Sequence, residues 1–246
     1  MRYFAFVLLL LIISCQSQET FLTAQQIIDK AIVFSGADKI GNSEITFKFR
    51  DKEYAAIREN GKFQLFRDHI KDSVLIDEVL SNDGYERLIN GKPVKVLDSM
   101  AFKYSNSINS VHYFSVLPFG LNDTAVRKKL LPSAIIKEKE YYKVEITFSE
   151  NGGGEDFEDV FIYWIGKETF LIDYLAYSFH TNGGGMRFRV LKEQCSKNGI
   201  RFVDYHNYIP INSKIKLHNL DTAFENNELQ KISEIVLEDI KVAILD

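Results

Sequence analysis

Regular alternation of apolar and polar residues is the feature that most restricts the fold of this chain. Ile45, Phe47 and Phe49 alternate with polar residues, and the stretch 141–148 repeats the pattern. Successive side chains of a β-strand point to opposite faces of a sheet, so a period of two is typical of strands buried on one face. The stretch 160–165 is apolar throughout, which predicts a central strand covered on both faces.

Short turn sequences separate the predicted strands. Asn60-Gly61, Asn90-Gly91 and Asn198-Gly199 are hairpin signals, because asparagine and glycine tolerate the positive φ of two-residue turns. They predict an antiparallel arrangement of roughly ten to twelve strands. We expect these strands near 45–50, 52–59, 63–68, 73–80, 85–90, 93–97, from 132 onward, 141–148, 160–165, 170–179, 186–195, 200–209 and 229–242.

Three segments carry signals of helices instead. Residues 24–35 place apolar side chains at helical spacing, directly after a capping box that begins at Thr23. Residues 98–117 contain no glycine or proline and also repeat apolar residues at helical spacing. Asn122 or Asp123 is expected to cap a short helix that ends at Leu130.

The order of these elements predicts the fold class. Helices that gather in two blocks, rather than alternating with strands, favour an α+β protein over repeated βαβ units. An antiparallel sheet of this length is expected to curl. We therefore expect a curved antiparallel sheet, with the helices covering its concave face.

The N-terminus carries an export signal. Arg2 precedes an apolar run, Tyr3 to Ile13, that is shorter than the ~20 residues needed to span a bilayer. The segment Ile12-Ile13-Ser14-Cys15 resembles the lipobox of bacterial lipoproteins. The resemblance implies cleavage before Cys15 and acylation of its sulfur; the alternative is an ordinary cleaved signal followed by a coincidental cysteine.

The predicted organisation of the chain follows from this cleavage. Residues 1–14 are the signal peptide, residues 15–22 are the lipidated cysteine and a short tether, and residues 23–246 form a single domain. The net charge of −4 argues against binding to nucleic acids, which requires a basic patch. Cys195 is the second of two cysteines, so with Cys15 acylated it has no partner for an intramolecular disulfide. It is a buried or bystander thiol, or a nucleophile without an evident activating neighbour.

Two resemblances extend this picture. The order of lipobox, short helix, strands, helical insertion and further strands resembles the LolA/LolB-like lipoprotein-sorting carriers. The segments 106–114, 117–121 and 160–164 are similar to an uncharacterised family of bacterial envelope lipoproteins, described as a domain of unknown function, over nearly all of 23–210. The resemblance implies a half-barrel with a helical lid, an apolar cavity and a place in the cell envelope, with the outer membrane expected.

Aromatic residues make up 13% of the chain and supply the candidate binding residues. We single out Tyr104, Phe114, Trp164 and Arg187 as candidate contacts for an apolar ligand. Arg187 shares a strand face with Arg189, and an inward arginine can anchor a ligand carboxylate or hold a lid. The alternatives are an ordinary aromatic core and arginines that face solvent on the convex side.

Catalytic, metal and cofactor sites are not expected. The glycine-rich segments 151–154 and 182–185 precede strands rather than helices, so they indicate wide loops and not phosphate sites. Asp204 and His206 share a strand face, but no further metal ligands are identifiable. The carboxylate run 155–159 lacks the ligand spacing of a calcium loop.

The sequence and its resemblances together give three hypotheses for function. The first is a membrane-anchored lipoprotein that binds an apolar ligand without catalysis: an acyl chain, a lipid or a lipidated polypeptide. The second is a protein–protein interaction module of an envelope assembly, with no small-molecule ligand. The third, an enzyme, would need a cluster of polar side chains that the sequence does not show.

Replacing Cys15 tests the predicted anchor. In the Cys15→Ser variant we expect loss of incorporated fatty acid and loss of membrane attachment, because stable anchoring requires two or more acyl chains. Labelling with a radioactive fatty acid, followed by membrane fractionation, measures both effects. Cys195→Ser is the matched control and should retain label and membrane attachment, whereas a Cys15→Ser protein that stays in the membrane contradicts the prediction.

Overall fold

The computed structural model describes residues 21–151, 157–180 and 183–245 of the chain. Cys15, the predicted signal peptide and most of the predicted tether lie outside the described residues. Parts of the glycine-rich segments 151–154 and 182–185 and of the carboxylate run 155–159 also lie outside them.

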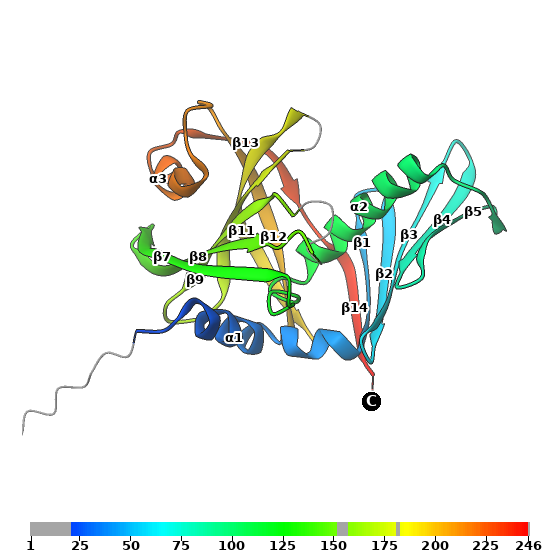
Figure 1. The fold of residues 1–246 in the computed structure, drawn as a ribbon, viewed down its shortest axis with the longest axis horizontal. Coiled ribbons are helices and arrows are strands. Elements are labelled where there is room, and N and C mark those ends of the chain that lie inside the picture. The colour runs from blue at the N-terminus through cyan, green and yellow to red at the C-terminus, as the bar shows by residue number, and fades with distance from the viewer. Residues whose placement is uncertain (1–20, 152–156, 181–182, 246) are drawn as a thin grey trace, which may run out of the picture.

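The described strands form two seven-stranded antiparallel sheets (Figure 1). The first sheet contains β1 (Ser43–Phe49), β2 (Lys52–Glu59), β3 (Lys62–Lys71), β4 (Val74–Ser81), β5 (Gly84–Ile89), β6 (Lys92–Pro93) and β14 (Glu238–Ile244). The second contains β7 (Val126–Ile136), β8 (Lys139–Phe148), β9 (Val160–Gly166), β10 (Ile172–Phe179), β11 (Gly185–Lys197), β12 (Ile200–Pro210) and β13 (Leu229–Ile235). Their orders are β14-β1-β2-β3-β4-β5-β6 and β13-β12-β11-β10-β9-β8-β7.

Helices cover both sheets. They are α1 (Ala24–Ser35), α2 (Asp98–Ser115) and α3 (Leu220–Glu225), with short 3₁₀ segments η1 (Ala37–Asn42) and η3 (Leu217–Asn219). Figure 1 shows α2 lying over one face of the first sheet, with its C-terminal end directed toward the second sheet. The apolar core follows the same plan, since Ile108 of α2 packs against the first sheet, whereas Tyr113 and Phe114 pack against the second.

The first helix forms as its sequence predicts. The Gln26 N–H donates to Thr23 Oγ1 at 3.2 Å, and the Thr23 N–H donates to Gln26 Oε1 at 2.9 Å, which completes the capping box. Gly36 ends the helix with a φ of 72°. The predicted Asn-Gly hairpin turns are confirmed too, with positive φ at both residues of each turn.

The predicted last strand, 229–242, is wrong in one respect that matters for the fold. The chain leaves the second sheet after Ile235 and enters the first sheet at Glu238, so two strands occupy this segment. At the crossing, the Leu237 N–H donates to Asp204 Oδ1 at 2.9 Å. Because β14 then pairs with β1, the end of the chain joins the two sheets (Figure 1).

The predicted helix from Asn122 or Asp123 to Leu130 is also wrong. The chain turns there and enters β7, whose Val126 pairs with Phe148 of β8. Asn122 does not cap a helix, because its amide binds α1: it donates to Asp29 at 2.8 Å and accepts from Gln25 at 2.8 Å.

The outer face of the second sheet is covered by a helix that the sequence analysis missed. Leu217 and Leu220, at the start of η3 and α3, belong to one apolar cluster with Trp164 and Phe188 of the sheet, and Phe224 packs against it. Helix α3 is a six-residue helix, too short for a clear periodic signal.

The fold class is confirmed as α+β with open antiparallel sheets and helices on their faces. The expected single curved sheet is corrected to two sheets, which the β13–β14 crossing connects. The stretch 160–165 is a central strand, as predicted, because β9 lies between β8 and β10.

Gly36 provides a test of how α1 is seated. Its φ of +72° favours glycine, and an added Cβ would lie 1.8 Å from the carbonyl oxygen of Gly199 in the β11–β12 turn. We expect Gly36→Ala to lower the free energy of unfolding by roughly 2–5 kcal/mol, since conformational strain and overpacking act together.

Gly61→Ala is the matched control for this prediction. Gly61 has a similar φ of +77°, but an added Cβ meets nothing within 4 Å. It should cost only ~1 kcal/mol, from the backbone conformation alone. Chemical denaturation of both variants measures the difference, and equal costs would show that the contact between Gly36 and Gly199 is not tight.

Candidate functional site

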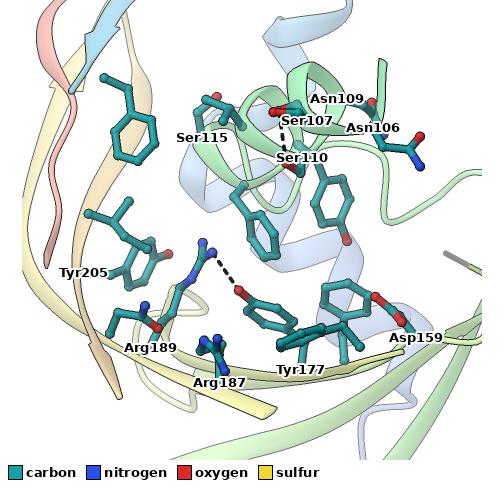
Figure 2. Close-up of a pocket in the computed structure, with 18 of the residues that line it drawn as sticks. Asn106, Ser107, Asn109, Ser110, Ser115, Asp159, Tyr177, Arg187, Arg189 and Tyr205 are labelled. Atoms are coloured by element: carbon teal, nitrogen blue, oxygen red, sulfur yellow. Dashed lines mark hydrogen bonds between the residues drawn. The ribbon is translucent and has the colours of Figure 1, made fainter. Parts of the chain in front are cut away.

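A cavity of about 890 Å³ lies between α2, the inner face of the second sheet and the start of the β13–β14 crossing (Figure 2). Its helical wall carries small polar residues, including Asn106, Ser107, Asn109 and Ser110. Its floor is the face of β9, β10, β11 and β12 that is turned toward α2. The cavity therefore has one polar wall and a floor built from the sheet.

Aromatic side chains cover much of this floor. The Phe114 ring of α2 lies 5.1 Å from Tyr177 and 6.1 Å from Phe161, centroid to centroid, and Phe161 lies 5.6 Å from Tyr177. Phe148 meets Phe161 edge to face at 5.8 Å. Aromatic rings that pack in this way present a large apolar surface, so they give the cavity an apolar lining.

Arg189 of β11 stands among these rings. It is 8% exposed, and its guanidinium carbon lies 3.8 Å from the centroid of Phe114. One terminal nitrogen donates to the Tyr177 hydroxyl at 3.0 Å, as Figure 2 shows, whereas Nε is buried without a hydrogen-bond partner in the described part of the chain. The cavity therefore holds a positive charge in apolar surroundings.

Arg187 and Asp159 lie further along the floor. The guanidinium carbon of Arg187 is 4.9 Å from the Phe179 ring, and its NH1 donates to the Met186 carbonyl oxygen at 2.9 Å. A carboxylate oxygen of Asp159 lies 3.6 Å from Nδ1 of His180. Figure 2 places the two side chains on opposite sides of Tyr177, with Arg187 on the side of Arg189.

Two tyrosines at the inner end are polar but uncharged. The hydroxyls of Tyr113 and Tyr163 lie 2.9 Å apart. Burial raises the pKa of Tyr113 and raises the pKa of Tyr163 well above its usual range, so both are protonated at neutral pH. They can share a hydrogen bond with one another, but they do not neutralise Arg189.

A buried ion pair fixes the helical wall to the first sheet. Glu78 is 1% exposed and lies 2.6 Å from NH2 of Arg67, while its other oxygen accepts from the Tyr85 hydroxyl at 2.6 Å. Arg67 also donates to the Ser107 hydroxyl of α2 at 2.8 Å. The position of α2 therefore depends on a polar network in the first sheet.

His112 is the second polar contact between α2 and this sheet. Its Nε2 lies 3.1 Å from the carbonyl oxygen of Phe66, and the ring is 1% exposed. The pKa of His112 is lowered to about 4: burial is the largest cause and the charges of Arg58 and Arg67 act in the same direction, whereas the hydrogen bond to Phe66 opposes them. The ring is therefore neutral at neutral pH and donates from Nε2.

The structure brings together two of the four candidate binding residues. Phe114 and Arg187 line the cavity. Tyr104 instead faces the first sheet, with its ring 6.0 Å from that of Tyr85 and 4.6 Å from the guanidinium carbon of Arg87. Trp164 is fully buried on the outer face of the second sheet, where Nε1 donates to Asp221 at 3.0 Å.

Arg189, Tyr177 and Asn207 also line the cavity but were not among the candidate contacts. Arg189 shares a strand face with the candidate Arg187, because β-strands repeat every two residues. Asn207 stands opposite Arg189 in the register of β11 and β12, and that pairing is not readable from local sequence.

A second hollow, of about 500 Å³, lies on the outer side beside α3. Lys143 there lies 2.8 Å from Asp221, and His218 lies 2.5 Å from Glu145. Because Lys143 already has an internal carboxylate partner, this hollow is a weaker candidate for a binding site.

Cys195 is an exposed free thiol on β11. Within residues 21–151, 157–180 and 183–245, no group of three or more His, Cys, Asp and Glu side chains converges as a metal site would. No helix in those ranges has the length and apolar character to cross a membrane.

The fold and the cavity define an α+β protein of two open antiparallel sheets, with a binding-sized cavity walled by a helix. The chain belongs to DUF6503, a family of unknown function, whose family model matches residues 1–238. The resemblance to an uncharacterised family is thereby confirmed. A search of the curated proteins found no match.

Several solved structures are similar to this chain. A DUF1329 family protein from Desulfovibrio piger ATCC 29098 is 12% identical, with a TM-score of 0.49 over 90% of this chain and 93% of that one. A putative outer membrane lipoprotein-sorting protein domain from Vibrio parahaemolyticus is 9% identical, with a TM-score of 0.43 over 89% and 93%. Mycobacterium tuberculosis lipoprotein LppX is 10% identical, with a TM-score of 0.29 over 65% and 90%.

The buried ring of His112 makes stability depend on pH. Its pKa falls from 6.5 to about 4 on folding, so the unfolded chain binds more protons between these values. We expect the free energy of unfolding to decrease as the pH falls from 6.5 to about 4, by on the order of 3 kcal/mol from this residue.

His112→Gln should show a shallower dependence on pH in this window, because glutamine can donate to Phe66 without titrating. Urea denaturation across the window measures the slope. His180→Gln, at an exposed histidine, is the control and should retain the slope of the unmodified protein. If His112→Gln retains it as well, His112 is not the residue responsible.

Proposed function

We propose that this protein is a non-catalytic binding protein of the cell envelope, which holds an apolar ligand in the cavity beneath α2. The ligand class is an acyl chain, a lipid or a lipidated polypeptide. The cavity itself carries the proposal, because an interior packed solid would leave no room for such a ligand.

The size and lining of the cavity support this function. Sites for small molecules span about 300–1,000 Å³ and are mainly apolar with a few placed polar groups. The cavity, at about 890 Å³, falls within this range, and Phe114, Phe161 and Tyr177 supply its apolar floor. A flexible chain with many methylene groups would bury most of its surface against these rings.

The lining also supports binding without catalysis. Neither histidine nor cysteine occurs among the described residues that line the cavity, although serines and Asp159 do. General acid–base and nucleophilic catalysis most often use histidine or cysteine beside a partner that activates them. The polar groups of the floor, Arg189, Tyr177 and Asn207, are instead suited to orienting a ligand.

Attachment to the membrane is the second part of the proposal. Acylation at Cys15, with a short tether to residue 22, would hold the domain near the bilayer, and the outer membrane is the expected location.

The alternative function, a protein–protein interaction module, is favoured by one feature of α1. Val33 and Phe34, near its C-terminal end, are 63% and 58% exposed. Phe34 contacts Phe170 at 5.4 Å, so the exposed side chains form a small apolar surface rather than isolated residues. This surface is separate from the cavity, and both functions are compatible with one chain.

Uptake of a neutral apolar dye tests the binding function. We expect N-phenyl-1-naphthylamine to fluoresce when mixed with the purified chain that starts at Gln16, which retains every described residue. Ser110→Trp should weaken this binding roughly 10-fold or more, because the indole would occupy volume beneath α2. Fluorescence titration gives both dissociation constants.

Ser99→Trp is the matched control for this experiment. Ser99 is an exposed serine of the same helix, outside the residues that line the cavity, so its replacement should leave dye binding unchanged. Equal loss in both variants would place the dye elsewhere. Absence of dye binding by the unmodified chain, with no lipid found by native mass spectrometry, would overturn the proposal and favour the interaction module.

A further inference from the structure

Arg189 is one of four buried arginines and lysines among the described residues, with Arg58, Arg67 and Lys143. Arg67 and Lys143 have a carboxylate oxygen within 2.6 and 2.8 Å, whereas Arg58 and Arg189 have none among the described residues. Of these last two, Arg189 lines the cavity and Arg58 does not. Arg189 is 8% exposed, yet no ion pair joins it to any carboxylate among the described residues, and its Nε has no hydrogen-bond partner there. A buried charge without a counter-charge is costly, so a partner from outside the chain would be bound strongly.

The geometry leaves the guanidinium open to such a partner. The guanidinium lies over the Phe114 ring, with its carbon 3.8 Å from the ring centroid. The N–H groups of a guanidinium form paired hydrogen bonds with carboxylates and phosphates, and contact with an aromatic ring supplies no such acceptor. Figure 2 shows the group extending from the sheet into the cavity.

Tyr177 adds a second donor to this position. Arg189 donates to the Tyr177 oxygen at 3.0 Å, which leaves the hydroxyl hydrogen of Tyr177 free to donate to a ligand. No acceptor for that hydrogen occurs in the described part of the chain. A ligand oxygen beside Arg189 would therefore accept from both side chains.

Asn207, like Arg189, lines the cavity and has a buried polar atom without a hydrogen-bond partner. It is 9% exposed and directly opposite Arg189 in the β11–β12 register. Its Nδ2 donates to the Ser233 hydroxyl at 3.0 Å, and its Oδ1 has no partner among the described residues. If the amide rotates, the Ser233 hydroxyl donates to Oδ1 and the NH₂ group becomes a further donor for the cavity.

We propose that the ligand of this cavity carries an anionic head group, a carboxylate or a phosphate, and that Arg189 binds it with help from Tyr177 and Asn207. The inference rests on the proposed function, since it names the head group of the apolar ligand assigned to the same cavity. The acyl chain then lies along Phe114 and Phe161. The charge is local to the site, because the chain as a whole carries a net charge of −4.

Displacement of N-phenyl-1-naphthylamine by three matched ligands tests this assignment. Dodecanoate, dodecyl phosphate and dodecanol share one chain length and differ in the head group. At neutral pH we expect at least one of the two anions to bind roughly 10-fold to 100-fold more tightly than dodecanol, as hydrogen bonds to a buried charge allow. The ratio of the dissociation constants of dodecanoate and dodecyl phosphate shows whether the site prefers a carboxylate or a phosphate head group.

Arg189→Gln should remove this preference. Dodecanoate and dodecyl phosphate should weaken to the level of dodecanol, while the binding of dodecanol and the neutral dye stays within about 3-fold of the unmodified protein. Lys103→Gln is the matched control: Lys103 is an exposed cation that also lines the cavity, so its loss tests general electrostatic attraction. It should leave the preference intact.

The outcomes separate the two proposals. If the dye binds and dodecanol competes as well as both anions, the head-group assignment is overturned and the proposed function stands. If the unmodified protein binds neither the dye nor any of the three ligands, the proposed function fails as well. Should Arg189→Gln not fold, the comparison of ligands on the unmodified protein decides, and Arg189→Lys tests whether a charge alone restores the preference.

Discussion

The buried carboxylate of Glu78 is the contact on which the rest of this structure depends. It accepts hydrogen bonds from Arg67 and Tyr85, and Arg67 reaches from it to Ser107 of α2. Removing one member of a buried ion pair costs about 3–5 kcal/mol, because the other charge is left without a partner. Since α2 forms one wall of the cavity, the hydrogen-bond network within the first sheet determines how much space is left between α2 and the second sheet.

The composition of α2 explains why that space is not filled. Its fully buried side chains are few, chiefly Ile108 and His112, and both face the first sheet. The side that faces the second sheet carries small polar residues such as Asn106 and Ser110, which cannot interdigitate with an aromatic floor. Tyr113 and Phe114, near the C-terminal end, pack against that sheet. The helix is therefore held from one side and leaves a cavity on the other.

Sequence patterns predicted the local elements well and the long-range arrangement less well. The capping box at Thr23 and the turn at Asn60-Gly61 are complete within a few residues, so their signals are local. The division of the strands into two sheets depends on the pairing of β14 with β1, between segments that are distant in the chain. Trp164 lies on a strand that is apolar on both faces, and alternation cannot assign such a residue to one face. The role of Arg189 likewise depends on what surrounds it, and only tertiary structure shows that no carboxylate of the described residues pairs with it.

Arg67 and Arg189 show how one residue type serves two purposes in this fold. Both are buried, but Arg67 has Glu78 beside it, whereas Arg189 lies against Phe114 and donates to an uncharged hydroxyl. For stability alone, an apolar side chain of similar length would suit the position of Arg189 better, because it would pack on the same ring without a desolvated charge. Apolar burial elsewhere in the sheet offsets the cost of this charge. On the outer face, Trp164 and Phe188 pack beneath α3, and this burial does not depend on the cavity. A charge that no described carboxylate neutralises at this position indicates selection for a ligand rather than for the stability of the sheet.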